Sequence, residues 1–172
     1  SGVTALGDYV ADPEMLGVID DLGFRSVLFL ETIGFHSEKA RVLCQQVEEV
    51  LKRVSLSPLG QLGLAPHAPY SVSPDLFGCL KKLAQKYHCP ISCHVAEIKE
   101  ESRFLVLGDD SLEELLKERA SWDPKWHPPY MSPMQYLSSL GFLDRLIAVH
   151  CNFVSDDIDI MKEKKVNAVF CP

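Results

Sequence analysis

The chain has 172 residues, of which 47% are hydrophobic and 24% are charged, and it carries a formal net charge of −7. This size and composition suit one globular domain and leave no need for a disordered tail. Because the negative charge is spread along the whole chain, we expect neither nucleic acid nor an anionic membrane surface as a partner.

The cysteines and the sorting signals bear on the compartment of the protein. Six cysteines lie in apolar runs without a C-x-x-C pair, which is typical of reduced thiols, so we expect no disulfide. The sequence contains no signal peptide, lipidation motif or apolar run of membrane length, and we therefore expect a cytoplasmic protein. Its start at Ser1, without Met, and its end within an apolar run indicate an excised internal piece.

One pattern recurs along the chain: an apolar strand followed by an amphipathic helix. Strands are predicted at 3–10, 26–34, 61–69, 89–97, 146–154 and 167–172. Helices are predicted to begin near Asp12, Ser37, Ser73, Lys99, Ser132 and Ser155, most of them marked by a capping side chain or an early proline. Strands that are apolar throughout must be buried on both faces, so we predict an α/β fold with a parallel sheet and right-handed crossovers.

Polar side chains near the carboxyl ends of the predicted strands favour a barrel over an open sheet. These residues are Asp8, Glu31, His67, His94 and His150. A ring of parallel strands brings such residues to one rim, whereas an open sheet leaves them in a row. The first strand is also not followed by a glycine-rich phosphate loop. We therefore predict part of a (β/α)8 barrel of the TIM type.

The segment at about 108–131 interrupts the pattern. It contains a small helix near 112–119 and an aromatic, proline-rich stretch around Trp122 and Trp126. We interpret it as an insertion within a single partial-barrel domain that spans 1–172. The two tryptophans either line a substrate entrance or pack the insertion against the barrel.

His94 and Glu97 are the first candidates for chemistry. A histidine at the end of a buried parallel strand can bind a metal ion, and a carboxylate three residues later can act over the same pocket as a general acid or base. A single His-x-x-Glu is also compatible with a merely structural polar pair. His67 and His150, at the ends of two other strands, strengthen the catalytic interpretation because all four residues would meet at one rim.

Other histidines have simpler interpretations, and two candidates keep a structural alternative. His67 can brace its turn, and His150 can be a core histidine bonded to a backbone carbonyl. We interpret His36, His88 and His127 as surface residues because loops or helix ends flank them.

Several motifs together resemble the metal-dependent aminohydrolases of the amidohydrolase superfamily, the group of the cytosine, guanine and adenosine-type deaminases and the triazine hydrolases. The motifs are Gly2-Val3-Thr4 with Gly7-Asp8, Ala65-Pro66-His67-Ala68-Pro69-Tyr70, His94-Val95-Ala96-Glu97 with Glu101, His150-Cys151, and Cys171-Pro172. The part from Glu97 to Gly141 is most similar to the aminodeoxyfutalosine deaminase and chlorohydrolase-like branch.

The resemblance implies a role for each candidate residue. His94 would bind the metal, zinc or iron, Glu97 would shuttle protons, His150 would orient the attacking hydroxide or the attacked group, and His67 would contact the substrate. The implied reaction is the hydrolytic deamination or dechlorination of a heteroaromatic ring, such as that of a purine nucleoside or a triazine.

Two features of the family have no counterpart here: the His-x-His pair of its first strand and the aspartate of its last strand. The chain therefore resembles six of the eight strands, the second to the seventh. His94 is the only remaining candidate ligand, and one imidazole cannot hold catalytic zinc. We expect this fragment alone to bind zinc weakly or not at all and to be inactive.

Alternative functions remain open at this stage. A metal-free binding or assembly module derived from a barrel is the main competitor, and a barrel hydrolase acting on an amide or lactam is a weaker one. A His-x-His pair encoded upstream and an aspartate encoded downstream would favour the enzyme. Because a six-stranded piece leaves two apolar strand edges without neighbours, we expect a homo-oligomer formed by strand pairing or exchange.

Overall fold

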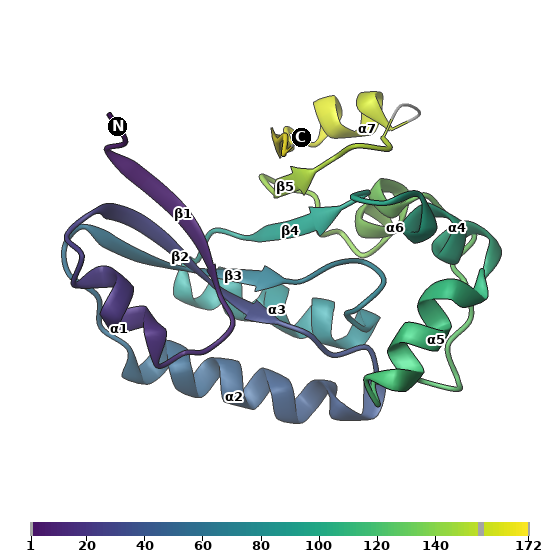
Figure 1. The fold of residues 1–172 in the computed structure, drawn as a ribbon, viewed down its shortest axis with the longest axis horizontal. Coiled ribbons are helices and arrows are strands. Elements are labelled where there is room, and N and C mark those ends of the chain that lie inside the picture. The colour runs from purple at the N-terminus through teal and green to yellow at the C-terminus, as the bar shows by residue number, and fades with distance from the viewer. Residues whose placement is uncertain (1, 155–156, 172) are drawn as a thin grey trace.

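The computed structural model describes residues 2–154 and 157–171, and these residues form an α/β fold with parallel strands (Figure 1). The strands are β1 Ala5–Val10, β2 Arg25–Thr32, β3 Gly60–Pro66, β4 Ser92–Val95, β5 Ile147–His150 and β6 Asn167–Val169. The helices are α1 Met15–Asp20, α2 Ala40–Arg53, α3 Pro74–Tyr87, α4 Lys99–Leu107, α5 Asp110–Glu118, α6 Pro133–Ser139 and α7 Ile158–Glu163, with a 3-10 turn, η1, at Ser37–Lys39. The predicted alternation of strand and helix is confirmed.

The six strands follow one another in space in the order of the chain. They form two parallel three-stranded sheets, β1-β2-β3 and β4-β5-β6. Two backbone hydrogen bonds link β3 to β4: Leu64 N–H donates to Pro90 C=O at 2.9 Å, and His94 N–H donates to His67 C=O at 2.8 Å. All strands therefore point the same way, and their carboxyl ends lie on one side of the molecule, as Figure 1 shows for β2, β3 and β4.

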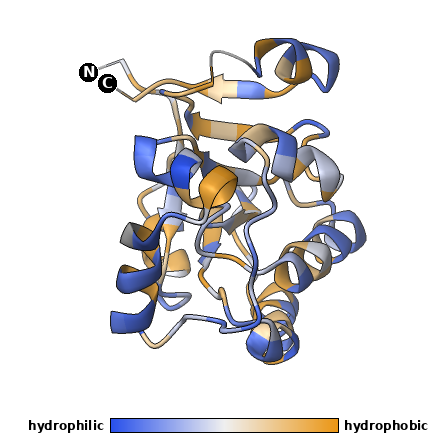
Figure 2. Ribbon diagram, turned by 90° about the vertical axis from the view of Figure 1, so that its right-hand side faces the viewer, coloured by the Kyte–Doolittle hydropathy of each residue, from blue (hydrophilic) through white to orange (hydrophobic). Residues whose placement is uncertain are grey.

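Helices α2 and α3 pack against each other and cover one face of the first sheet (Figure 1). The apolar spacing of α2 buries Ala40, Cys44, Val47, Val50 and Leu51. Figure 2 shows that hydrophobic residues follow the strands and the inward helix faces, whereas the outer helix faces are hydrophilic. The apolar pattern that predicted these helices is therefore the pattern that forms the main core.

Two helix starts follow the predicted caps, whereas α1 begins at Met15 with Glu14 in place of Asp12 as its N-cap, and α2 begins at Ala40, after η1. Ser73 Oγ accepts a hydrogen bond from Leu76 N–H at 3.3 Å at the start of α3, with Pro74 as the first helical residue. Ser132 forms a capping box with Gln135 at the start of α6. The predicted cap at Ser155 lies outside the described residues.

The segment 108–131 contains α5 and is tied to the fold by aromatic contacts. The Trp126 ring stacks on Phe104, with centroids 4.3 Å apart, and the Trp122 ring stacks on Phe35, with centroids 5.8 Å apart. These rings belong to a second cluster, separate from the main core, whose buried members are Phe35, Phe104, Leu105, Leu112, Leu116 and Tyr136. The tryptophans therefore pack the segment against the fold, which is one of the two roles considered for them.

Two expectations from the sequence are wrong. Cys44 of α2 and Cys79 of α3 form a disulfide, with their Cα atoms 6.2 Å apart, because the contact between these helices brings the two side chains together. His36 is half-buried rather than a surface residue, since it follows Phe35 of the second cluster, and its buried Nδ1 has no hydrogen-bond partner among the described residues. His88 and His127 are exposed, as predicted.

Within the described part of the chain, no helix combines the length and the hydrophobicity needed to span a bilayer.

Candidate active site

The predicted site residues come together at the carboxyl ends of the strands. The imidazole centroid of His94, on β4, lies 5.2 Å from that of His67, just after β3, and 5.2 Å from that of His150, the last residue of β5. Glu31, near the end of β2, reaches the same place. The shared position follows from the parallel strand order, which aligns Val95 with His150 and Glu31 with Ala65.

The residue of β1 that joins this group is Tyr9, not Asp8. Neighbouring residues of a strand point to opposite faces, so the two side chains cannot both reach the interior. Asp8 is exposed, whereas the ring of Tyr9 stacks on His94 with centroids 4.4 Å apart. The sequence offered the alternation as a signal, but it did not indicate which of the two positions faces inward.

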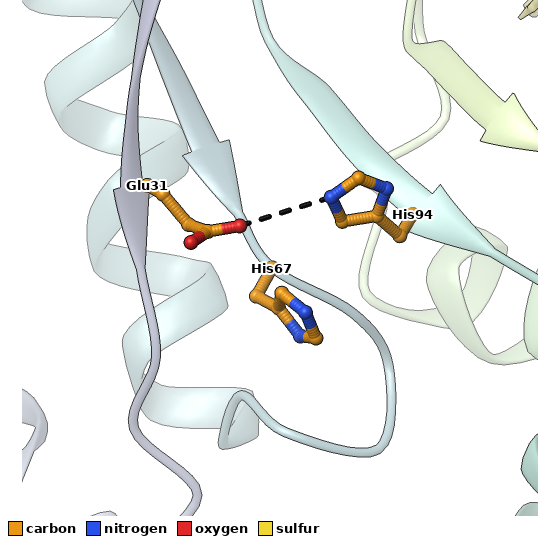
Figure 3. A group of neighbouring side chains, drawn as sticks. All are labelled: Glu31, His67 and His94. Atoms are coloured by element: carbon orange, nitrogen blue, oxygen red, sulfur yellow. Dashed lines mark ion pairs between the residues drawn. The ribbon is translucent and has the colours of Figure 1, made fainter. Parts of the chain in front are cut away.

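Glu31, His67 and His94 form a candidate metal centre (Figure 3). Each offers one ligand atom, and these atoms lie within 4.8 Å of one another. Glu31 Oε1 and His94 Nε2 face each other at 3.7 Å, close to the separation of about 3.3 Å between ligand atoms of tetrahedral zinc. Two imidazole nitrogens and a carboxylate oxygen are a donor set that zinc accepts, so the residues present fit the ion after a small contraction.

The surroundings of His67 leave one ring nitrogen free for this role. The Ser71 hydroxyl donates to Ala68 C=O at 3.3 Å, so its oxygen accepts a hydrogen bond from His67 Nδ1–H at 2.6 Å. This network assigns the tautomer in which Nε2 carries the lone pair. Burial also lowers the pKa of His67, which favours the neutral ring, and the interaction with the nearby His94 ring lowers the pKa of Glu31, which favours the carboxylate.

The interpretation of His94 as the only candidate ligand is therefore wrong. Glu31 had been recognised as a polar residue at a strand end, but its proximity to His94 depends on the curvature of the sheet, which brings β2 and β4 together across β3. The only feature of the sequence that pointed to Glu31 was its position at a strand end, which indicates a ligand less specifically than the histidine motifs do.

Glu97 and His150 form a second pair beside the metal centre. Glu97 Oε1 lies 3.6 Å from His150 Nε2, and their side chains are 42% and 18% exposed. A carboxylate that is half open to solvent and faces an imidazole can take up and release protons. The structure thus brings together all four residues that the sequence singled out: His67, His94, Glu97 and His150.

The turns after β4 and β5 hold this pair in place. Ala96, His150 and Cys151 have left-handed backbones, with φ of 51°, 75° and 53°. The N–H groups of Asn152 and Phe153 donate to Ala96 C=O at 3.0 and 3.2 Å, and Asn152 Nδ2 donates to Glu97 C=O at 3.1 Å. Unfavourable backbone conformations persist where surrounding hydrogen bonds determine them, and here they fix the two turns to each other.

Glu101 lies beneath Glu97 and was quoted in the sequence motifs without a role. Its side chain is 0% exposed, and its Oε2 accepts a hydrogen bond from Glu97 N–H at 3.2 Å. Burial raises the pKa of Glu101 to about 8, so its carboxyl is mostly neutral at pH 7.

No protein-family model matches the chain. The chain is 30% identical over 179 residues to the 5'-deoxyadenosine deaminase of Methanocaldococcus jannaschii, covering 100% of this chain and 38% of that protein. The crystal structure of the Helicobacter pylori aminofutalosine deaminase matches with a TM-score of 0.78 and 21% identity over 98% of this chain and 42% of that one. An adenosine deaminase from Xanthomonas campestris with bound zinc matches with a TM-score of 0.65 and 23% identity over 99% of this chain and 36% of that one.

The chain thus spans about two fifths of the length of the curated relatives it matches. The matched proteins bear the names of deaminases of the kind that the motifs predicted, and the structural likeness extends over almost the whole chain. The predicted resemblance is thereby confirmed: along its full length, this chain is similar to proteins named as deaminases.

Proposed function

We propose that the protein containing this chain is a metal-dependent aminohydrolase that deaminates a heteroaromatic ring, with a purine nucleoside as the preferred class of substrate. The observation that carries the proposal is the meeting of His94, Glu97 and His150 at one rim, with two further candidate ligands beside His94. The names of the sequence relatives favour the adenosine-type substrate over a triazine.

The proposed roles follow from position. His94 binds zinc or iron, and a bound ion of this kind lowers the pKa of water that it coordinates. Glu97 removes one proton from the attacking water and passes it to the ring. It then carries the second proton of that water, from the newly added hydroxyl, to the leaving amine. His150 hydrogen-bonds the attacking oxygen. For His67, in the loop after β3, the substrate contact predicted from the sequence competes with the metal-ligand role that its distance to Glu31 and His94 allows.

The fold proposal is that these six β/α units form part of a (β/α)8 barrel and that residues at about 108–131 are an insertion in it. Consecutive parallel strands in chain order support the barrel, because an open doubly wound sheet reverses its order at a switch point. The polar residues at the carboxyl ends also match the place where such barrels carry their active sites. The cytoplasmic location and the homo-oligomeric state expected from the sequence remain predictions.

A metal-free binding module is the competing proposal, and the donor set argues against it. A module without metal chemistry has no need to keep a carboxylate 3.7 Å from an imidazole nitrogen beside a second, serine-oriented histidine. Burying such groups costs free energy that binding an ion recovers.

The test is an assay of the complete protein for ammonia release. 5'-Deoxyadenosine, 5'-methylthioadenosine, adenosine, guanine and a chlorinated triazine form the panel, with chelator-treated protein and the Glu97→Gln variant as controls. We expect release from at least one adenosine-type compound, loss after chelation and recovery with zinc. Absence of turnover on the entire panel by zinc-loaded protein would overturn the deaminase proposal, and chloride release from the triazine alone would replace it with dechlorination.

A further inference from the structure

Glu101 combines features that are unusual for a glutamate. It belongs to the first turn of α4, where glutamates are normally solvated, but its side chain is 0% exposed. Its Oε1 is buried without a hydrogen-bond partner among the described residues. A carboxyl that only caps a helix can do so from the surface, so its burial here requires another explanation.

The hydrogen bond made by Glu101 offers that explanation. Its Oε2 accepts from the N–H of Glu97, which lies before the helix cap Ile98, so the contact reaches beyond α4 into the turn after β4. That turn begins with Ala96 in a left-handed conformation, which an alanine does not favour. The turn is held from the other side by Asn152, whose side chain donates to Glu97 C=O.

We propose that Glu101 is a positioning residue for Glu97: its buried carboxyl holds the Glu97 peptide from below, so that the Glu97 carboxylate stays directed at His150. This inference rests on the proposed role of Glu97 as the proton shuttle. The backbone of Glu97 is clamped at both ends, its N–H by Glu101 and its C=O by Asn152, while its side chain remains free to move a proton.

The charge of Glu101 matters for this role because its titratable neighbours other than Glu97 stay neutral. The titratable groups that act on it or respond to it are Glu97, Tyr70 after β3, Cys93 on β4 and Cys151 after β5. Burial raises the pKa of Tyr70 to about 12, that of Cys151 to about 11 and that of Cys93 well above its usual range. Of Glu101, Tyr70, Cys93 and Cys151, it is therefore Glu101 whose charge changes between pH 6 and 9.

Ionisation of Glu101 has a defined consequence for Glu97. A negative charge on Glu101 repels the nearby Glu97 carboxylate and so displaces it from its position facing His150. We therefore expect turnover to fall above about pH 8 for a reason separate from the ionisation of the substrate or the metal site.

The experiment compares three variants of the complete protein: Glu101→Gln, Glu101→Ala and the matched control Glu100→Gln from the same turn of α4. Hydrogen–deuterium exchange of a peptide covering 92–104 measures how firmly the turn around Glu97 is held. Steady-state deamination across pH 6–9 measures proton transfer by Glu97. The glutamine keeps an acceptor oxygen, so Glu101→Gln should keep the protection of the peptide and keep kcat at pH 7 within about threefold. Its kcat should no longer fall above pH 8.

Glu101→Ala should lose the protection and reduce kcat by about 100-fold, the cost of a small misplacement of a reacting group, with little change in KM or zinc content. Equal behaviour of the alanine and glutamine variants would overturn the proposal, as would an unchanged alkaline fall in Glu101→Gln. If the alanine variant does not fold, the pH profile of the glutamine variant decides alone. If the complete protein deaminates nothing, the proposed function fails, and the exchange measurement still tests whether Glu101 clamps the turn.

Discussion

The ring of Tyr9 lies on the imidazole of His94, with centroids 4.4 Å apart and planes inclined by 24°. Tyr9 belongs to β1 and His94 to β4, two strands that are separated by β2 and β3 in the strand order. The Tyr9 hydroxyl and Ser92 Oγ, also of β4, form a hydrogen bond of 2.5 Å. Strands that are three places apart touch only if the sheet curls, so this contact is the strongest sign that the six strands wrap around a shared interior.

The clearest test of the proposed mechanism is Glu97→Gln in the complete protein. A proton shuttle acts during the reaction and not in metal binding, so kcat should fall by about two to four orders of magnitude while zinc content stays the same. Glu100→Gln, three residues further along, is the matched control. Steady-state kinetics and metal analysis give the answer, and full turnover by Glu97→Gln would remove Glu97 from the mechanism.

Zinc binding by this chain is a second test, and the structure changes what we expect of it. Sequence alone predicted little or no binding because His94 had no visible companion. With Glu31 and His67 beside it, we now expect one zinc ion per chain. Removing even an indirect support of a metal ligand costs 10- to 100-fold in affinity, so Glu31→Gln or His94→Ala should weaken binding by on the order of tenfold or more.

Calorimetric titration of the dialysed protein with zinc, with the Cys44–Cys79 disulfide intact, measures this affinity. Glu48→Gln serves as control, since Glu48 forms a surface ion pair with Lys86, away from the strand ends. Equal zinc affinity for the native chain and for Glu31→Gln would remove the carboxylate from the ligand set and return the site to His94 alone.

Glu101 also makes the stability of the chain depend on pH. Burial raises its pKa in the folded state to about 8, above the value of about 4.5 for an exposed glutamate. A raised pKa means that the folded state binds the proton of Glu101 more tightly than the unfolded state does. The resulting contribution to the free energy of unfolding is therefore fully present below pH 4.5 and is lost as the pH rises towards 8. In Glu101→Gln this slope of about 1.4 kcal/mol per pH unit should disappear.

Urea denaturation at several pH values between 4.5 and 9 measures the difference between the native chain and Glu101→Gln. Other titrating groups contribute equally to both proteins and cancel in this difference. A constant difference across the range would show that Glu101 ionises in the folded state as it does in water.

The outer strands predict self-association. β6 is exposed along its whole length, half of the residues of β1 are exposed, and Val169 and Phe170 are 43% and 70% exposed. Exposed apolar strand edges pair with other chains, so we expect this chain to form dimers or larger species as its concentration rises. Val169→Lys places a charge on β6 and should shift the chain towards monomer. Light scattering coupled to size-exclusion chromatography tests this, and a monomer at all concentrations would contradict it.

Much of the fold was predictable because its determinants are local. Apolar runs marked the strands, and Ser73 and Ser132 marked helix starts through hydrogen bonds that span only three residues. Strand-end position was enough to bring His67, His94 and His150 together, because parallel strands align their carboxyl ends. The sequence therefore predicted those site residues whose position depends only on one strand and the turn that follows it.

The missed features all depend on contacts between distant elements. The proximity of Glu31 to His94 and the inward orientation of Tyr9 rather than Asp8 both depend on how the sheet curls. The disulfide depends on which faces of α2 and α3 meet, which hydrophobic spacing alone does not reveal, since Cys44 behaves as an ordinary core residue in the apolar pattern.

The aromatic cluster around Phe35, Phe104, Trp122 and Trp126 is separate from the main core, and this separation affects how the protein can evolve. Substitutions that reshape the segment at about 108–131 act on a few stacked rings, whereas His94 lies on β4, whose apolar residues belong to the main core. The segment at about 108–131 can therefore vary in sequence and length while the strand ends keep their geometry.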